Sequence, residues 1–151
     1  MSAIPQAVFD ADAYKETTRQ QWDKAADAWH HWGPLLSKWL GPATEQMLDM
    51  AGVRPGSRVL DVAAGAGEQT MTVARRIGPD GYVLATDISG TILRFVAQLA
   101  RAEGHTHVHT RELDGECCDE LEPDSFDVVV SRVGLIYLPD RQRALSGMHR
   151  V

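Results

Sequence analysis

An acidic residue and two glycines occur close together between Val59 and Thr70, where an apolar run leads into a glycine turn. In a dinucleotide-binding turn, backbone N–H groups receive a pyrophosphate, so a carboxylate at Asp61 would repel such a ligand. The same carboxylate favours a ligand that presents a cation, and Gly65 and Gly67 allow the backbone to approach that ligand closely. The segment therefore predicts a site for a sulfonium or ammonium ligand such as the methyl donor S-adenosylmethionine.

A second acidic residue, Asp87, stands twenty residues beyond Gly67, at the predicted end of the next strand. A carboxylate there can accept hydrogen bonds from both hydroxyls of a ribose. The alternative is that Asp87 only caps the helix that follows Ser89. Together with the glycine turn, the pattern favours the ribose role, and Ile88 is included in the same predicted subsite.

A third polar segment, Asp114-Gly115-Glu116, follows the third predicted strand. Its side-chain carboxylates can take an adenine amino group, and the neighbouring backbone can bind the edge of the ring. The alternative interpretation is an ordinary polar turn. The fourth predicted strand ends at Ser131, which we place at the crevice where open α/β sheets bind ligands.

The hydrophobic pattern predicts the elements that carry these motifs. Apolar residues recur at helical spacing from Asp12 to about Trp32, and Gly33-Pro34 is expected to end that helix. The further expected elements are helices at 35–40 and 43–50, a strand at 58–62, a helix at 68–77, a strand at 82–86, a helix at 90–103, strands at 105–113 and 126–131, and a helix from 139. This alternation predicts an α/β fold, a Rossmann-like doubly wound parallel sheet of strand order 3-2-1-4 behind N-terminal helices.

Composition limits the class of protein. The chain has 151 residues, 44% of them hydrophobic, which is enough for one domain with a buried core. The net charge is −6 and the basic residues form no long cluster, so nucleic acid is a disfavoured partner. Cys117 and Cys118 are adjacent and do not readily form a disulfide with each other, which favours a reducing cytoplasm. We expect neither a membrane span nor a leader peptide.

Three tryptophans, Trp22, Trp29 and Trp32, share one predicted helical face. Packing against the sheet is the simpler interpretation, and the alternative is that Trp29 or Trp32 covers the methyl donor with a cation–π contact. His30 and His31 have no Cys, His or carboxylate partner at the spacing of metal ligands, so no metal site is predicted.

The segments 59–70, 114–116 and 126–140, together with Asp87, resemble the motifs of class I S-adenosylmethionine-dependent methyltransferases. The subgroup they resemble most is that of the ubiquinone/menaquinone-biosynthesis C-methyltransferases, methyltransferase type 11. The resemblance implies a helical lid over residues 1–43 and an S-adenosylmethionine-binding domain over residues 44–151.

The resemblance also assigns roles to single residues. It implies that Asp61 and the two glycines surround the methionine part of the donor, that Asp87 binds the ribose, and that Asp114 binds adenine. Ala63 stands where the family has its first glycine and still leaves a small side chain.

A complete member of that family continues into a fifth strand, so the chain is expected to stop before that strand and to be incomplete at its C-terminus. The strand at 126–131 would then be an unpaired, valine-rich edge. Such edges pair with another chain or are covered. We therefore expect a homo-oligomer through this edge, unless a longer polypeptide supplies the missing strand.

The predicted function is methyl transfer from S-adenosylmethionine to a small-molecule acceptor. In-line displacement depends mainly on orientation and on exclusion of water, so no catalytic triad is expected. No general base is identified; Arg132 and Tyr137 are the crevice candidates, and for each of them a structural role is the favoured alternative. Two alternatives are a nicotinamide-dependent oxidoreductase, which Asp61 and the absence of glycine at position 70 oppose, and a non-catalytic module for donor binding or assembly.

Overall fold

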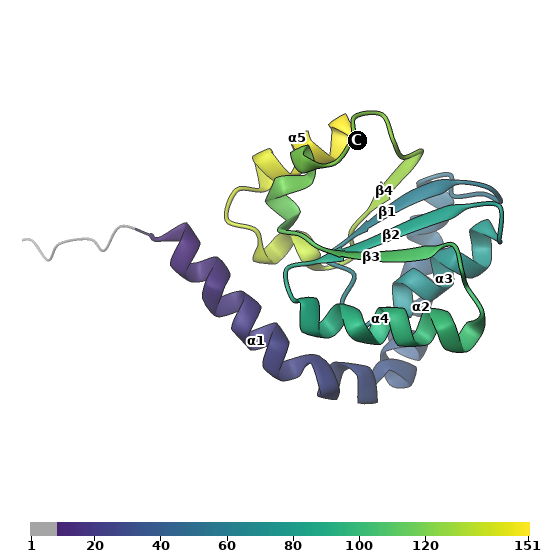
Figure 1. Cartoon of the computed structure of the whole chain (residues 1–151), viewed down its shortest axis with the longest axis horizontal. Helices are drawn as coiled ribbons and strands as arrows, with labels where there is room; N and C mark the ends of the chain where they lie inside the picture. Colours follow the sequence, from purple (N-terminus) through teal and green to yellow (C-terminus); the bar gives the residue numbers. More distant parts are fainter. Residues whose placement is uncertain (1–8) are drawn as a thin grey trace, which may run out of the picture.

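The computed structural model describes residues 9–151, so the first eight residues of the predicted lid lie outside it. Four strands form one parallel sheet, shown in Figure 1. They are β1 (Arg58–Val62), β2 (Tyr82–Asp87), β3 (Val108–Glu112) and β4 (Val128–Val130). Their order across the sheet is β3-β2-β1-β4, which confirms the predicted fold class and strand order.

Strand β1 lies inside the sheet, with Leu60 in register between Leu84 of β2 and Val129 of β4. Val59, Leu60 and Val62 have no exposed surface because helices or loops cover both faces of the strand. A strand buried on both faces needs a continuous apolar run, and after the exposed Arg58 the residues of β1 form one except at Asp61.

Helices lie on both sides of the sheet (Figure 1). The helices are α1 (Ala11–His31), α2 (Gly33–Met50), α3 (Glu68–Ile77), α4 (Gly90–Glu103) and α5 (Arg141–Arg150), and the 3₁₀ turns are η1 (Gly115–Glu120) and η2 (Gly134–Tyr137). Helices α2 and α3 pack on one face around Leu48 and Ile77, whereas α5 and η1 pack on the other around Cys118 and Val151. The two inner strands, β1 and β2, thereby gain the two-sided cover that this architecture requires, whereas most residues of the edge strand β3 are exposed.

Helix α2 corrects the sequence prediction. Two helices separated at Gly41-Pro42 were expected, but a single helix runs from Gly33 to Met50 with Pro42 inside it. Proline disfavours helical backbone at the preceding residue through a clash with that residue's Cβ, and Gly41 has no Cβ. The hydroxyl of Thr44 also donates to the Leu40 carbonyl oxygen at 3.1 Å. The predicted domain boundary between residues 43 and 44 consequently falls within one helix.

Strands β3 and β4 are shorter than predicted. His107 is buried ahead of β3, with its Nε2 3.1 Å from the Ala74 carbonyl oxygen. The first residues of the alternating pattern over 105–113, which predicted a strand, therefore lie outside the sheet. Before β4, the backbone N–H of Phe126 donates to the Val151 carbonyl oxygen, and the Asp127 carboxylate accepts from the Arg58 N–H. The Asp127 N–H also donates to the Arg58 carbonyl oxygen at 2.8 Å, so contact with β1 begins at Asp127, whereas Phe126 is bonded to the C-terminal residue instead.

Within residues 9–151, β4 pairs in the sheet with β1 alone. Assembly of two chains through its other edge stays a prediction. No helix in this described part of the chain is long and apolar enough to cross a membrane.

We predict that Ser89→Ala lowers the free energy of unfolding by about 1–2 kcal/mol, the usual cost of losing a helix cap. The Ser89 hydroxyl oxygen accepts from the Ile92 N–H at 3.1 Å and donates to Asp23 of α1 at 2.6 Å, so it joins α1 to α4. Urea denaturation measures the change. Ser37→Ala, at an exposed position of α2, is the control, and equal effects of the two substitutions would refute the cap.

Candidate functional site

A cavity of about 250 Å³ lies between the carboxyl ends of the strands and helices α1 and α2. Of the ten predicted site residues, six line it: Ala63, Gly65, Asp87, Ile88, Asp114 and Gly115. The opposite wall is formed by side chains of the two N-terminal helices: Lys15, Thr18, Trp22, Trp29, Leu36, Trp39 and Leu40. The three sequence motifs therefore converge on one cavity, and a covering helix pair that the motifs did not specify completes it.

Asp61 lies beneath the glycine turn and has no exposed surface. Its two carboxylate oxygens accept from Gln69 Nε2 at 2.5 Å and from Thr70 Oγ1 at 2.8 Å. Burial raises the pKa of Asp61 to about 6, and the two hydrogen bonds and the charge of Arg132 oppose that rise. Asp61 thus ties the end of β1 to α3, and its direct contact with a ligand cation stays a prediction.

Three further predicted residues lie just outside the cavity lining. Gly67 has a φ of 106°, and a Cβ there would lie 3.1 Å from the Val96 Cα, so glycine permits the close approach of α3 to α4. Ser131 has a buried hydroxyl without a hydrogen-bond partner in the described part of the chain. Glu116 is almost fully buried and forms an ion pair with Lys15. Their contact with the cofactor is untested.

Asp87 lines the cavity and also shapes the loops around it. One carboxylate oxygen accepts from the Gly65 N–H at 3.0 Å and the other from the Ser89 N–H at 3.0 Å. Burial raises its pKa, and the backbone N–H groups oppose this shift. Each oxygen retains a lone pair, so the turn-forming role and the predicted ribose role are compatible.

The cavity floor contains unusual backbone. Ala63 and Val133 have φ values of 56° and 67°, in the left-handed region that residues with a Cβ rarely adopt. The two loops meet where Gly134 approaches Ala63, since a Cβ on Gly134 would lie 2.5 Å from the Ala63 Cβ. Nothing in the sequence motifs signals the strain at Val133.

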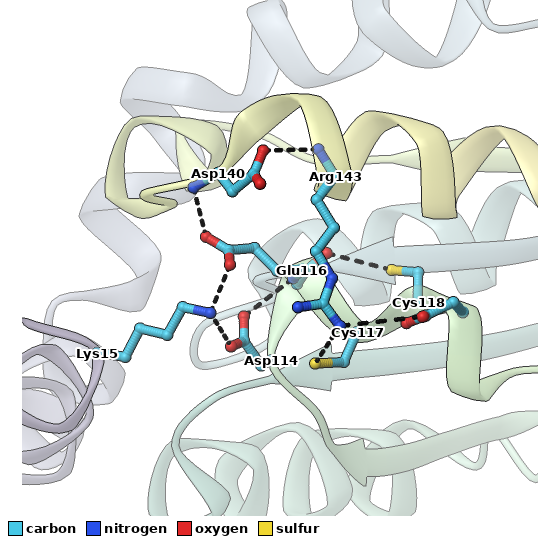
Figure 2. A network of polar contacts seen from close by, with 9 residues as sticks. Lys15, Asp114, Glu116, Cys117, Cys118, Asp140 and Arg143 are labelled. Carbon is cyan, nitrogen blue, oxygen red and sulfur yellow. Dashed lines mark hydrogen bonds and ion pairs between the residues drawn. The ribbon is translucent and has the colours of Figure 1, made fainter. Parts of the chain in front are cut away.

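Figure 2 shows how α1 is attached at the Asp114 end of the cavity. Lys15 Nζ is 2.8 Å from Asp114 Oδ2 and also donates to Glu116 Oε2. Glu116 in turn accepts from the backbone N–H of Asp140, the N-cap of α5, at 2.7 Å. Burial alone would lower the pKa of Lys15, but the hydrogen bonds to the two carboxylates outweigh it and raise that pKa. Sequence reasoning missed Lys15, which lies 101 residues from Glu116.

Aromatic rings of α1 cover the glycine turn. The rings of Trp22 and Trp29 meet edge to face at 5.3 Å, and Trp22 meets Tyr137 at 5.4 Å. Trp29 Nε1 lies 3.4 Å from the position of a Cβ on Gly65. Trp32 is mostly exposed and does not line the cavity. Of the two tryptophans proposed as covers, the geometry supports Trp29 alone.

The two cysteines are free thiols beside this site. Arg143 lies 4.0 Å from the Cys117 sulfur, a basic neighbour that the sequence did not indicate (Figure 2). Burial nevertheless raises the pKa of Cys117, and it raises the pKa of Cys118 to about 11. Neither thiol is therefore activated as a nucleophile at neutral pH.

The lining suits a ligand with ribose hydroxyls at one end and a cationic group at the other. The Asp87 carboxylate can accept from hydroxyls, and the indole faces near Gly65 can contact a sulfonium. Gln69 lines the cavity, is 3% exposed, and has an Oε1 with no partner in the described residues. That orphaned acceptor fits an ammonium group, so the residues present fit S-adenosylmethionine.

Comparisons with known proteins agree with this geometry. The model of the ubiE/COQ5 methyltransferase family matches residues 38–151. The ubiquinone/menaquinone biosynthesis C-methyltransferase UbiE of Teredinibacter turnerae is 32% identical over 105 residues, which are 69% of this chain and 42% of that protein. The demethylmenaquinone methyltransferase of Geobacillus kaustophilus is 33% identical over 71% of this chain and 45% of its own length.

A solved methyltransferase structure supports the fold. The S-adenosylmethionine-dependent methyltransferase from Aquifex aeolicus superimposes with a TM-score of 0.65 at 19% identity, over 95% of this chain and 68% of that one. The chain spans about two fifths of the length of the first curated relatives it matches.

We predict that Lys15→Met lowers the free energy of unfolding by about 1–3 kcal/mol, because it leaves two carboxylates side by side without their shared cation. Urea denaturation at neutral pH measures the change. Lys24→Met removes the same charge from an exposed position of α1 and is the control. A Lys15 variant as stable as the Lys24 variant would show that the ion pair contributes nothing.

The buried carboxyl of Asp61 predicts a pH dependence. Its pKa is raised on folding from 3.8 to about 6, so the folded chain retains a proton that the unfolded chain has already released. As the pH rises through the range between these two pKa values, wild type should lose about 2–3 kcal/mol of stability relative to Asp61→Asn, which cannot ionise. Urea denaturation of both proteins from pH 4 to 7 tests this, and parallel curves would contradict it.

Proposed function

The chain belongs to the ubiE/COQ5 methyltransferase family, and on that premise we propose that its cleft binds S-adenosylmethionine for methyl transfer to a small-molecule acceptor. One observation carries the proposal: Gly65, Asp87 and Asp114, at or after the carboxyl ends of three separate strands, line one wall of the same cavity. S-adenosylmethionine supplies an activated methyl group on its sulfonium. The family supports methyl transfer over the oxidoreductase alternative.

Each part of the cavity has a proposed partner in the cofactor. Asp87 and Ile88 would hold the ribose, Asp114 and Gly115 the adenine, and the turn at Gly65 the methionine part. Lys15 already occupies one oxygen of Asp114 at 2.8 Å, so adenine would use the remaining lone pairs. Asp61, Gly67, Glu116 and Ser131 would act by positioning these loops, since none of them lines the cavity.

The lining also supports catalysis by orientation. A methyl group moves in line from sulfur to the acceptor atom, so the chief needs are alignment and exclusion of water. Trp22 and Trp29 cover the turn and exclude solvent from it. Two relatives named as a ubiquinone/menaquinone biosynthesis C-methyltransferase and a demethylmenaquinone methyltransferase support a quinone-related acceptor.

The proposal also concerns the cellular compartment of the reaction and the cover of its site. Two free thiols at Cys117 and Cys118 favour a reducing compartment such as the cytoplasm. Helix α1 and the part of α2 before residue 44 would form the lid of the cofactor domain, because their side chains make one wall of the cavity.

Isothermal titration calorimetry with S-adenosylhomocysteine tests the proposal. We predict binding by wild type and about ten- to hundredfold weaker binding by Asp87→Asn, which loses the charged acceptor for the ribose hydroxyls. Asp80→Asn, on an exposed turn, is the control and should bind as wild type does. Failure of folded wild-type chain to bind at millimolar ligand would refute the function, and an unchanged Asp87 variant would remove that residue from the site.

A further inference from the structure

Arg132 brings a positive charge to the cavity wall. Within residues 9–151 its guanidinium has no carboxylate within 4.0 Å, and its hydrogen-bond partner there is Thr44 Oγ1, which accepts from one terminal nitrogen at 2.5 Å. Burial lowers the pKa of Arg132, but a guanidinium remains protonated in proteins. Most of its N–H donors are therefore left without a partner in a partly desolvated site.

Two carboxylates, those of Asp61 and Glu68, act on Arg132 from beyond ion-pair distance, and Glu68 also lines the cavity. Asp61 accepts from Gln69 and Thr70, beneath the turn. The carboxylate of Glu68 lies against the start of α2, where a Cβ on Gly33 would be 2.5 Å from its Oε1. Their charges favour the protonated form of Arg132 from a distance without forming an ion pair with it.

Arg132 is also held in place. Thr44 is 1% exposed and is fixed by its own hydrogen bond to the Leu40 carbonyl oxygen. On the other side, Val133 is strained at a φ of 67° and Gly134 is packed against Ala63. Backbone strain that the surrounding structure maintains is typical of functional sites. Two elements, α2 and the loop after β4, thus present one guanidinium to the cavity.

We propose that Arg132 determines acceptor specificity by binding an oxyanion of the acceptor, a phenolate, enolate or carboxylate oxygen. The inference rests on the proposed function, in which the cavity also receives an acceptor. Charge-assisted hydrogen bonds are about twice as strong as neutral ones. A neutral acceptor leaves the buried donors unpaired and binds less well, so the site discriminates by charge.

The probe for the experiment is 4-nitrophenol, whose neutral and ionised forms have different absorption spectra. Spectrophotometric titration of the probe with the chain, without a methyl donor, gives both the affinity and the ionisation of the bound probe. Wild type is expected to bind the ionised form and to lower the pKa of the bound probe. Arg132→Met should abolish that shift and weaken phenolate binding about ten- to hundredfold.

Matched variants distinguish the effect of the charge at Arg132 from the effect of the net charge of the chain. Arg101→Met removes an exposed arginine of α4 and should leave probe binding unchanged. Thr44→Val keeps the guanidinium but removes its hydrogen-bond partner, so it should reduce the shift. 4-Nitroanisole, the neutral analogue, should bind weakly and equally to wild type and to Arg132→Met.

A second ligand, 4-nitrobenzoate, identifies the kind of oxyanion. Preference for nitrophenolate would indicate that the bound oxygen belongs to the reacting group, and preference for nitrobenzoate would indicate a separate carboxylate anchor. Either result supports the proposal.

Two outcomes would overturn it. The first is that wild type binds nitrophenol without lowering its pKa, a result that needs no variant and is independent of any folding defect. The second is that Arg132→Met weakens S-adenosylhomocysteine binding while probe binding is unchanged, which would assign Arg132 to the cofactor. If wild type fails to bind S-adenosylhomocysteine but binds the phenolate through Arg132, the proposed function fails and the oxyanion site stands.

Discussion

The cavity depends on one buried polar contact, between the carboxylate of Asp61 and the side chains of Gln69 and Thr70. It joins the last part of β1 to the first turn of α3. The two ends of the glycine turn between them are therefore held in place. A charge with no exposed surface is tolerated only when donors satisfy it, and two side chains do so here. The amide of Gln69 then extends this contact to the cavity, where its oxygen has no partner among residues 9–151.

The covering helix α1 is attached at two points along its length. Lys15, near its start, binds the carboxylates of η1, and Asp23, near its middle, accepts from the cap of α4. Between these attachments lie Thr18 and Trp22, which line the cavity. Both attachments are made to segments adjoining the proposed nucleoside site. Helix α1 is therefore fixed directly to the segments that form that site.

Most of the helices, strands and site residues that the sequence predicts correctly follow from local patterns. The bounds of β1 and α3 agree with the apolar run and the glycines at 67 and 78, and Ser89 caps α4 as its residue type indicates. Six motif residues reach the cavity because parallel strands place their carboxyl ends at one edge.

What the sequence could not show depends on contacts between distant segments. The pairing of Lys15 with Glu116, and of Thr44 with Arg132 across 88 residues, has no short-range signature. Continuity of α2 through Pro42 depends on the absence of a single Cβ at Gly41. Gly41-Pro42, a pattern that usually ends a helix, therefore does not end this one, and the alternating pattern over 105–113 does not indicate the inward turn of His107.

All four tryptophans of the chain lie on the two N-terminal helices or at the junction between them: Trp22, Trp29, Trp32 and Trp39. Three of them line the cavity, and the sheet and the helices after residue 50 contain none. Indole emission from the unlabelled chain consequently comes entirely from the covering helices. The molecule contains its own optical reporter, in which a change of intensity or wavelength marks an event at the cover and not in the sheet beneath it.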